Sequence, residues 1–177
     1  RGAKFLVDVY AGQKTGFFLD QRENRFLLRR LGKGRDVLNC FCFSGGFSVN
    51  AALGGAKSVF SVDQDADAIA LARENFPLNG LEPASHDFLA ADVFELLESF
   101  KQEGRTFDLI VLDPPAFAKS QKAVESAVAG YASLNRQALA LLRPDPVDAP
   151  EADDALGVIK LAVAGRPNVG KSTLINT

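Results

Sequence analysis

The segment from Val37 to Ser48 constrains the fold more than any other part of the chain. It begins with a short apolar run, Val37–Phe41, that predicts a buried strand, and residues 49–53 then have the spacing of a helix. Ser44-Gly45-Gly46 between them predicts a tight turn. Glycines there let a ligand approach the backbone, and free amides at the helix start favour polar or anionic groups. The spacing differs from Gly-x-Gly-x-x-Gly, so a plain strand-to-helix turn is the alternative interpretation.

An acidic residue follows this turn at an informative distance. A second β-branched run, Lys57–Val62, ends at Asp63, about 20 residues beyond the glycine turn. In nucleotide-binding folds an acidic residue at this point holds a ribose through its hydroxyls. The turn and Asp63 together predict a nucleoside-containing cofactor.

Strands and helices alternate through the rest of the chain. We expect further strands over residues 85–90 and 107–112, helices capped by Asp65 and Asp92, and a long helix over residues 124–141. This alternation predicts an α/β fold with a mostly parallel, doubly wound sheet. Ahead of it, the sequence predicts a β-hairpin built from Phe5–Val9 and Thr15–Leu19, followed by a helix over about residues 22–32.

Four polar features fall at the ends of predicted strands. They are Ser44–Gly46, Asp63, Asp92 and Asp113. Ligands in such sheets bind beyond the carboxyl ends of the strands, so we expect these groups to converge on one rim. For Asp92, a simple helix cap is the alternative interpretation.

The fourth strand runs into Asp113-Pro114-Pro115-Ala116-Phe117. Two prolines hold the backbone extended, which fixes the carboxylate at the strand tip and displays Phe117 beside it. A carboxylate next to an aromatic ring suits a planar base that is hydrogen-bonded on its edge and stacked on its face.

Composition limits the class of protein. The 177 residues are 47% hydrophobic, with a mean hydropathy of +0.02, which is enough for one globular core and part of a second. No apolar run approaches about 18 residues and no signal peptide is recognisable, so we expect a cytoplasmic protein without a membrane partner. Two cysteines and one histidine offer neither a disulfide framework nor a Cys/His metal site.

Charge is unevenly distributed although the net charge is only -2. Residues 1–35 carry nine Lys/Arg and three Asp/Glu, whereas residues 145–154 carry five acidic residues and no basic one. The basic section could lie along an RNA backbone or be a solvated face. The acidic, proline-bearing section predicts a linker.

Several of these motifs together resemble a known family. Residues 14–22 (Lys-Thr-Gly-Phe-Phe-Leu-Asp-Gln-Arg), the Asn39–Ser48 loop, Ser61-Val62-Asp63 and residues 113–117 are similar to the S-adenosylmethionine-dependent 23S rRNA large-subunit methyltransferases that make 5-methylcytosine. The resemblance covers about residues 3–143. It implies a Rossmann-like class I methyltransferase fold, here incomplete at its C-terminal strands, with S-adenosylmethionine as cofactor and rRNA or a ribosomal precursor as partner.

The resemblance also implies roles for individual residues. The loop that contains Asn39, Phe41, Ser44, Gly45 and Gly46 would hold the methionine part of the cofactor. Asp63 would hold the ribose, Asp92 the adenine, and Asp113 would contact the cofactor and face the target base. The substrate side would be formed by Arg22, Pro114, Pro115 and Phe117.

The chain also departs from this family. The family's RNA-binding domain of the PUA type is absent ahead of this region, and the sequence leaves the pattern at Arg143-Pro144, before the segment with the nucleophilic cysteine. Methylation at a pyrimidine carbon needs a thiolate, so we expect impaired activity. Cys40 and Cys42 are interpreted as small apolar residues and His86 as structural. An RNA amino-group N-methyltransferase needs no cysteine and is an alternative, although Ala116 separates the prolines from the aromatic ring.

The C-terminal tail resembles a different family. Residues 165–172 form a complete Gly-x-x-x-x-Gly-Lys-Ser phosphate loop, and residues 158–177 look like the start of a G domain from the tandem-domain ribosome-assembly GTPases. Phosphates would be held by Gly165, Asn168, Gly170 and Lys171, and a magnesium ion by Ser172. The rest of a G domain is missing. A GTP-binding fragment is therefore the alternative function, with weak phosphate binding at most.

The resulting domain plan has four parts. Residues 1–34 form the hairpin and helix, 35–143 the truncated cofactor-binding domain, 144–157 the acidic linker, and 158–177 the truncated G domain. Residues 158–164 are predicted to form a strand that pairs beside the fourth strand, since the 124–142 helix supplies a crossover. Loss of the last family strands predicts low stability or self-association. The oligomeric state stays open.

Overall fold

The computed structural model describes residues 2–8, 16–118, 123–144 and 161–163. Five strands are present in this part: β1 (Asp36–Cys40), β2 (Ser58–Asp63), β3 (Asp87–Ala90), β4 (Leu109–Leu112) and β5 (Leu161–Val163). Five α-helices accompany them: α1 (Arg22–Leu31), α2 (Gly46–Leu53), α3 (Ala66–Glu74), α4 (Val93–Gln102) and α5 (Val124–Ala140). Short 3₁₀ helices lie at Leu19–Gln21, Pro77–Asn79 and Pro83–Ser85.

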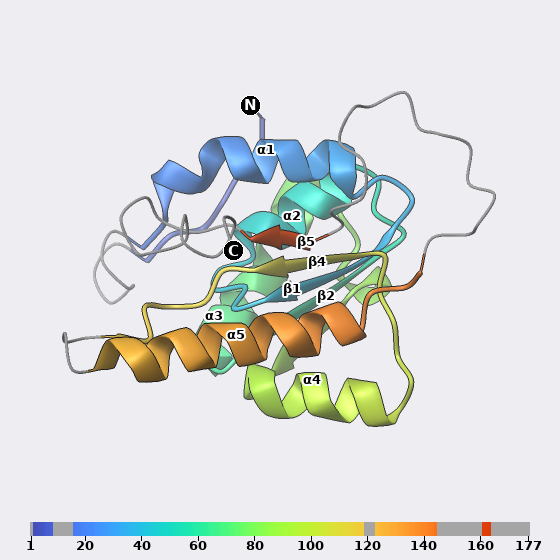
Figure 1. The fold of residues 1–177 in the computed structure, drawn as a ribbon. Coiled ribbons are helices and arrows are strands. Elements are labelled where there is room, and N and C mark those ends of the chain that lie inside the picture. Colours follow the sequence, from blue (N-terminus) through green and yellow to red (C-terminus); the bar gives the residue numbers. More distant parts are fainter. Residues whose placement is uncertain (1, 9–15, 119–122, 145–160, 164–177) are drawn as a thin grey trace.

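The strands form one parallel sheet in the order β3-β2-β1-β4-β5 (Figure 1). The order reverses between β1 and β4, and this point is where an open α/β sheet binds its ligands. At the far edge, Leu161–Val163 pairs in register with Ile110–Leu112. The sequence therefore predicted both the α/β fold and the pairing of the C-terminal strand with β4 correctly.

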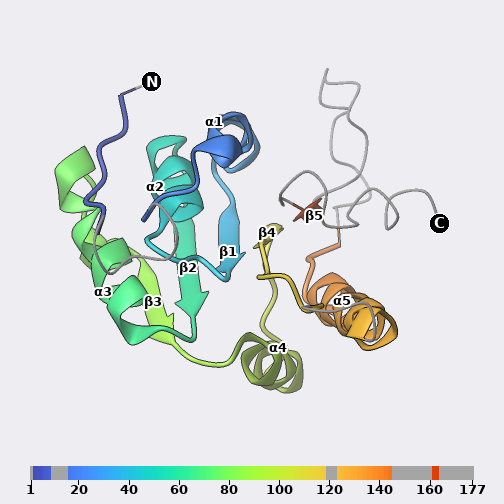
Figure 2. The same ribbon diagram turned by 90° about the vertical axis from the view of Figure 1, so that its left-hand side faces the viewer.

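Alternate residues of each central strand face two separate cores. Val37, Val59 and Val111 pack with α1 and α2, while Leu38, Val62 and other alternate residues pack with α4 and α5 on the opposite face. Figure 2, turned from Figure 1, shows α1 and α2 on one side of the sheet and α4 and α5 on the other. Burial on both faces explains why β1, β2 and β4 carry apolar residues at consecutive positions rather than at alternate ones.

Helix α1 lies tightly against α2. Gly54, just past the end of α2, has no room for a side chain, because a Cβ there would overlap the backbone of Arg29. The Arg29 guanidinium also donates to Oδ1 of Asn50 at 2.8 Å, and Leu28 is buried beneath. These contacts join the C-terminal halves of α1 and α2, and Arg25 packs against Gly46 at the start of α2.

The predicted N-terminal hairpin shows no strand pairing in the described residues, although its two arms lie side by side, with the Phe5 and Phe17 ring centroids 4.7 Å apart. Residues 2–8 form no strand, and residues 16–18 bend into the 3₁₀ helix at Leu19–Gln21; residues 9–15 lie outside the description. Side-chain amides accept hydrogen bonds from one side of the first arm. The backbone N–H of Lys4 donates to Asn79 at 2.8 Å, and that of Leu6 donates to Asn75 at 2.7 Å.

The long helix is only partly buried. Leu134, Ala138 and Leu141 are inside, whereas Val124 and Val128 are 44% and 57% exposed. The N-terminal half of α5 extends beyond the carboxyl ends of the strands (Figure 1), so its apolar spacing does not imply burial. In the described part of the chain, no helix is long and apolar enough to cross a bilayer.

Candidate functional site

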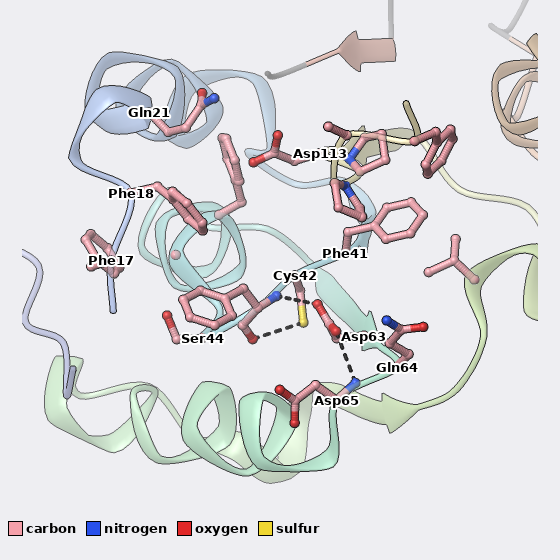
Figure 3. A pocket seen from close by; sticks show the side chains of 18 of the residues that line it. Phe17, Phe18, Gln21, Phe41, Cys42, Ser44, Asp63, Gln64, Asp65 and Asp113 are labelled. Atoms are coloured by element: carbon pink, nitrogen blue, oxygen red, sulfur yellow. Dashed lines mark hydrogen bonds between the residues drawn. The ribbon is translucent and has the colours of Figure 1, made fainter. Parts of the chain in front are cut away.

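A cavity of about 540 Å³ opens at the carboxyl ends of β1, β2 and β4. It brings together most of the residues that the sequence singled out: Phe41, Ser44, Gly46, Asp63, Asp92, Asp113, Pro114, Pro115 and Phe117. Figure 3 shows Asp113 and Gln21 on one side of the hollow, with Asp63 and Asp65 across from them. The predicted convergence of the strand-end groups on one rim is therefore confirmed.

Three predicted residues lie outside the cavity wall. Asn39 is completely buried beneath the loop, where its Nδ2 donates to the Ser48 hydroxyl at 2.8 Å. Gly45 lies behind the wall, and the exposed Arg22 pairs with Glu23 at 3.0 Å on the solvent side of α1. Asn39 and Gly45 therefore shape the loop from behind.

The loop after β1 is held in an unusual backbone conformation. Phe41 and Phe43 have φ values of 59° and 48°, in the left-handed region that side chains other than glycine rarely adopt. Such residues cost about 1–3 kcal/mol each and cluster at ligand-binding loops. Two bonds hold the conformation: the Cys42 N–H donates to the Val62 carbonyl at 3.0 Å, and the Gly45 N–H donates to the Cys42 carbonyl at 2.9 Å.

Asp63 anchors the same loop through its carboxylate. Its Oδ2 accepts from the backbone N–H of Phe43 at 2.8 Å, and its Oδ1 accepts from the N–H of Asp65 at 3.1 Å. A carboxylate has about four acceptor positions, so two remain for other donors. Because Asp63 lines the cavity, these positions suit the paired hydroxyls of a ribose.

The helices that follow β1, β2 and β3 begin at the cavity and start in different ways. Asp65 and Asp92 cap α3 and α4 by accepting from first-turn amides, whereas α2 begins after Gly45, which has no side chain to accept a bond. Gly45 has a φ of 76°, and a Cβ there would lie 2.9 Å from the Cβ of Ala72. Backbone conformation and packing against α3 therefore both exclude a capping side chain.

The start of α2 is polar and unsatisfied. First-turn amides have no acceptor within their own helix, and α2 has no side-chain cap. The Ser44 hydroxyl next to them is buried and has no hydrogen-bond partner in the described structure. This corner of the cavity therefore offers hydrogen-bonding groups to a polar or anionic ligand.

Asp92 both caps a helix and lines the cavity. Its Oδ1 accepts from the N–H of Phe94 at 2.8 Å and from that of Glu95 at 3.1 Å. The cap interpretation is confirmed. Both bonds go to the same oxygen, so the cap leaves Oδ2 for a ligand donor.

Tyr131 holds the segment after β4, although the sequence indicated it only as a helix-face residue. Its ring stacks on Phe117 with centroids 4.4 Å apart and planes 22° apart. Its hydroxyl accepts from the Phe117 N–H and donates to the Pro115 carbonyl, each at 3.3 Å. α5 thereby fixes the position of Phe117 beside Asp113.

Arg25 was also missed by the sequence reasoning. It lines the cavity while only 7% exposed, and its guanidinium carbon lies 4.4 Å from the centroid of the Phe17 ring. Burial lowers the pKa of Arg25 below its ordinary value, and the charges of Asp20 and Asp113 oppose this effect. Gln21, Arg25 and Leu28 form the buried stripe of α1, and their i, i+4, i+7 spacing could have identified Arg25.

Both thiols are buried and free. Burial raises the pKa of Cys40 and of Cys42 far above the usual range, and Asp63 raises that of Cys42 further. Although Cys42 lines the cavity, each thiol is therefore neutral and poorly nucleophilic. His86 is structural as predicted, because its Nδ1 accepts from the Val59 N–H at 3.2 Å.

Known proteins share this sequence pattern. A family model described as S-adenosylmethionine-dependent methyltransferase matches residues 1–159. Relatives named ribosomal RNA large subunit methyltransferase I are 48% identical over 146 residues in Aeromonas hydrophila and 43% identical over 143 residues in Salmonella typhi. The matches cover 82% and 81% of this chain, but 37% and 36% of those relatives. The chain thus spans a little over a third of the length of the curated relatives it matches.

Solved structures share the fold. One assigned as a methyltransferase and complexed with SAH has a TM-score of 0.70 and 38% identity, over 79% of this chain and 37% of that one. The SAM-dependent methyltransferase from Agrobacterium tumefaciens has a TM-score of 0.69 and 28% identity, over 81% of this chain and 47% of that one.

The predicted phosphate loop gains no such support. Its residues, Gly165 to Ser172, lie outside the described residues, as does most of the predicted linker at 144–157. The family match ends at residue 159, ahead of the loop. Among the described residues, no group of three or more His, Cys, Asp or Glu side chains could hold a metal ion.

Proposed function

Because the chain belongs to the S-adenosylmethionine-dependent methyltransferase family, we propose that its cavity binds S-adenosylmethionine for methyl transfer to ribosomal RNA. One observation carries this proposal: Asp63, the uncapped start of α2 and the oxygen of Asp92 not used by the cap all meet in one cavity. These groups suit a ribose, a polar amino-acid end and an adenine amino group respectively.

The positions of the ribose and the adenine follow from the carboxylate oxygens of Asp63 and Asp92, which can accept more hydrogen bonds than the protein donates to them. Asp63 accepts the two ribose hydroxyls while its bond to Phe43 keeps the loop in place. Asp92 accepts from the exocyclic amine of adenine through Oδ2, beside the ring of Phe94. The amino-acid end then lies toward Ser44 and Gly46, at the start of α2.

The substrate side is formed by the segment after β4. Asp113 hydrogen-bonds the edge of the target base, and Pro114, Pro115 and Phe117 form the surface beside it. The names of the relatives support rRNA as the substrate class. Arg22, the exposed first residue of α1, follows the cavity residue Gln21 and suits the RNA backbone.

We propose cytosine C5 as the target atom of the family chemistry, with an impaired methyl-transfer step in this chain. C5 transfer requires a thiolate that adds to the pyrimidine ring. The 177 residues contain two cysteines, and both are buried and neutral. Cofactor binding does not depend on that thiolate and is expected to persist.

The buried thiols also favour a second candidate, methyl transfer to an exocyclic amino group, because that reaction needs no cysteine. Product analysis separates the two. Digestion of an rRNA fragment after incubation with labelled S-adenosylmethionine yields N-methylated nucleoside under the second candidate and little or no product under the first.

Calorimetric titration of the full chain tests the proposal itself. We expect S-adenosylmethionine to bind with a dissociation constant on the order of micromolar. GTP with magnesium, titrated separately, tests the predicted Gly165–Ser172 phosphate loop, for which we expect weak binding at most. Absence of S-adenosylmethionine binding, or binding of GTP alone, would contradict the proposed function.

A further inference from the structure

The guanidinium of Arg25 opens onto the cavity without a protein partner among the described residues. The residue as a whole is 7% exposed, and in the part of the chain that the structure describes it makes no hydrogen bond and no ion pair within 4.0 Å. Its guanidinium carbon lies 4.4 Å from the centroid of the Phe17 ring, a contact that supplies no hydrogen-bond acceptor oxygen. A guanidinium carries five N–H donors, and no described protein group accepts from those of Arg25. Because Arg25 lines the cavity, a ligand can satisfy them.

Arg25 lies directly over the start of α2. A Cβ built on Gly46 would be 3.1 Å from Cδ and 3.5 Å from Nη1 of Arg25. The guanidinium, the uncapped first-turn amides and the unpartnered Ser44 hydroxyl therefore occupy one corner. All three donate hydrogen bonds, and the helix start adds a partial positive charge. This combination is typical of a site for a carboxylate or a phosphate.

Two carboxylates line the cavity near this corner. The negative charges of Asp20 and Asp113 both attract the guanidinium of Arg25, although neither carboxylate lies close enough to form an ion pair with it. An isolated carboxylate or phosphate would be repelled by these two anions. A zwitterion would not be, because its cationic end can face the aspartates while its anionic end faces Arg25.

We infer that Arg25 binds the α-carboxylate of the amino-acid end of the cofactor, while Asp20 and Asp113 face the α-ammonium. This assignment rests on the proposed binding of S-adenosylmethionine. It gives Arg25 a ligand role, and it makes the pocket selective for adenosyl ligands that keep their amino-acid carboxylate.

Two ligands that differ only in the carboxylate provide the test. The full chain is titrated calorimetrically with S-adenosylmethionine and with decarboxylated S-adenosylmethionine. The wild-type chain should prefer the first by about 10- to 100-fold, as expected for hydrogen bonds between charged groups. Arg25→Met should bind the two ligands nearly equally. Arg25→Lys should keep part of the preference, since lysine retains the charge but lacks the planar fork.

Two controls separate ligand binding from folding. 5′-Methylthioadenosine lacks the amino-acid end, so each Arg25 variant should bind it as the wild type does if the pocket is intact. Arg30→Met, a change at an exposed arginine of the same helix, should retain the wild-type preference.

Three results would count against the assignment. If Arg25→Met keeps the wild-type preference, the carboxylate lies elsewhere and the assignment is wrong. If Arg25→Met loses affinity for all three ligands equally, Arg25 has a structural role. If the wild-type chain binds none of the adenosyl ligands, the proposed function fails together with this assignment.

Discussion

The first-turn amides of α2, α3 and α4 all lack an acceptor within their own helix, but only α3 and α4 have a side chain that accepts from them. In α3 and α4, aspartates at positions 65 and 92 accept from the first-turn amides at 2.8–3.3 Å. In α2, glycine occupies that position and no side chain accepts. Two helices are thus completed by the chain itself, and the third is left for a ligand to complete.

Packing against a neighbouring helix explains the difference. α2 starts close against α3, where Ala72 leaves no room for a Cβ on Gly45, and the backbone at Gly45 is left-handed. An aspartate at position 45 would be strained by the left-handed backbone and would collide with Ala72. The uncapped helix start is therefore a consequence of close packing, and the cavity benefits from the amides that this packing leaves free.

Gly45→Ala should have the largest effect, because it forces a side chain into the uncapped start. The left-handed φ and the contact with Ala72 together should lower the free energy of unfolding by about 2–4 kcal/mol. That loss corresponds to a fall in Tm on the order of 5–10 °C for a chain of this size, measured by circular dichroism. Ligand affinity should fall as well.

Gly34→Ala is the matched control for this variant. Gly34 also has a positive φ, 68°, but a Cβ there would have no atom within 4 Å. Gly34→Ala should lower the free energy of unfolding by about 1–2 kcal/mol, the cost of a left-handed backbone conformation alone. Equal losses in the two variants would show that the Ala72 contact does not matter.

Asp63→Asn should weaken the binding of S-adenosylmethionine by about 10- to 100-fold. The amide keeps one acceptor oxygen, so it cannot serve the Phe43 N–H, the Asp65 N–H and two ribose hydroxyls together. Calorimetric titration measures the loss. Asp67→Asn, on the exposed side of the α3 first turn, is the control, and a similar loss there would argue against a specific role of Asp63.

Asp65→Ala and Asp92→Ala remove the two caps and should each destabilise the fold by about 1 kcal/mol. Their effects on ligand binding should differ. Asp92→Ala should lose more affinity for 5′-methylthioadenosine, because that ligand keeps the adenine that Asp92 is proposed to contact. Denaturant unfolding measures the stability of each variant, and calorimetric titration measures its affinity for 5′-methylthioadenosine. Equal affinity losses in Asp65→Ala and Asp92→Ala would show that Asp92 is not part of the adenine site.

The smallest expected effect is a pH dependence due to His86, away from the cavity. Burial against Phe76 lowers the pKa of His86 below its ordinary value, and the nearby Asp87 opposes this. The folded chain therefore binds a proton less readily than the unfolded chain. The free energy of unfolding should fall as the pH drops below about 6.5, until folded His86 also protonates.

His86→Gln provides the comparison for that pH series, since it removes the chain's one histidine. The decline near pH 6 should largely disappear in this variant. An unchanged decline would mean that other groups cause it.

Local sequence signals predicted the repetitive fold and the rim of the site. Apolar runs marked the strands, and aspartates marked the starts of α3 and α4, because both signals depend on neighbouring residues. Asp63, Asp92 and Asp113 were found because the carboxyl ends of parallel strands converge. These features need no knowledge of long-range packing.

The missed features depend on contacts between distant residues. The backbone N–H groups of residues 4 and 6 donate to the side chains of Asn79 and Asn75, which are far away in the sequence. Tyr131 reaches Phe117 only because α5 passes beside the segment after β4. The i, i+4, i+7 spacing of Gln21, Arg25 and Leu28 marks Arg25 as a buried position, but Arg25 reaches the cavity only because α1 packs on α2. No local pattern reports such contacts.

The most direct test of this account is a ¹H–¹⁵N NMR titration with S-adenosylhomocysteine that follows backbone amides at the starts of α2 and α3. The account predicts large shifts for Gly46 and Phe47 at the start of α2. It predicts small shifts for Asp67 and Ala68, which Asp65 already caps in α3. Comparable shifts at both places, or unmoved α2 amides despite binding, would contradict the claim that a ligand completes the start of α2.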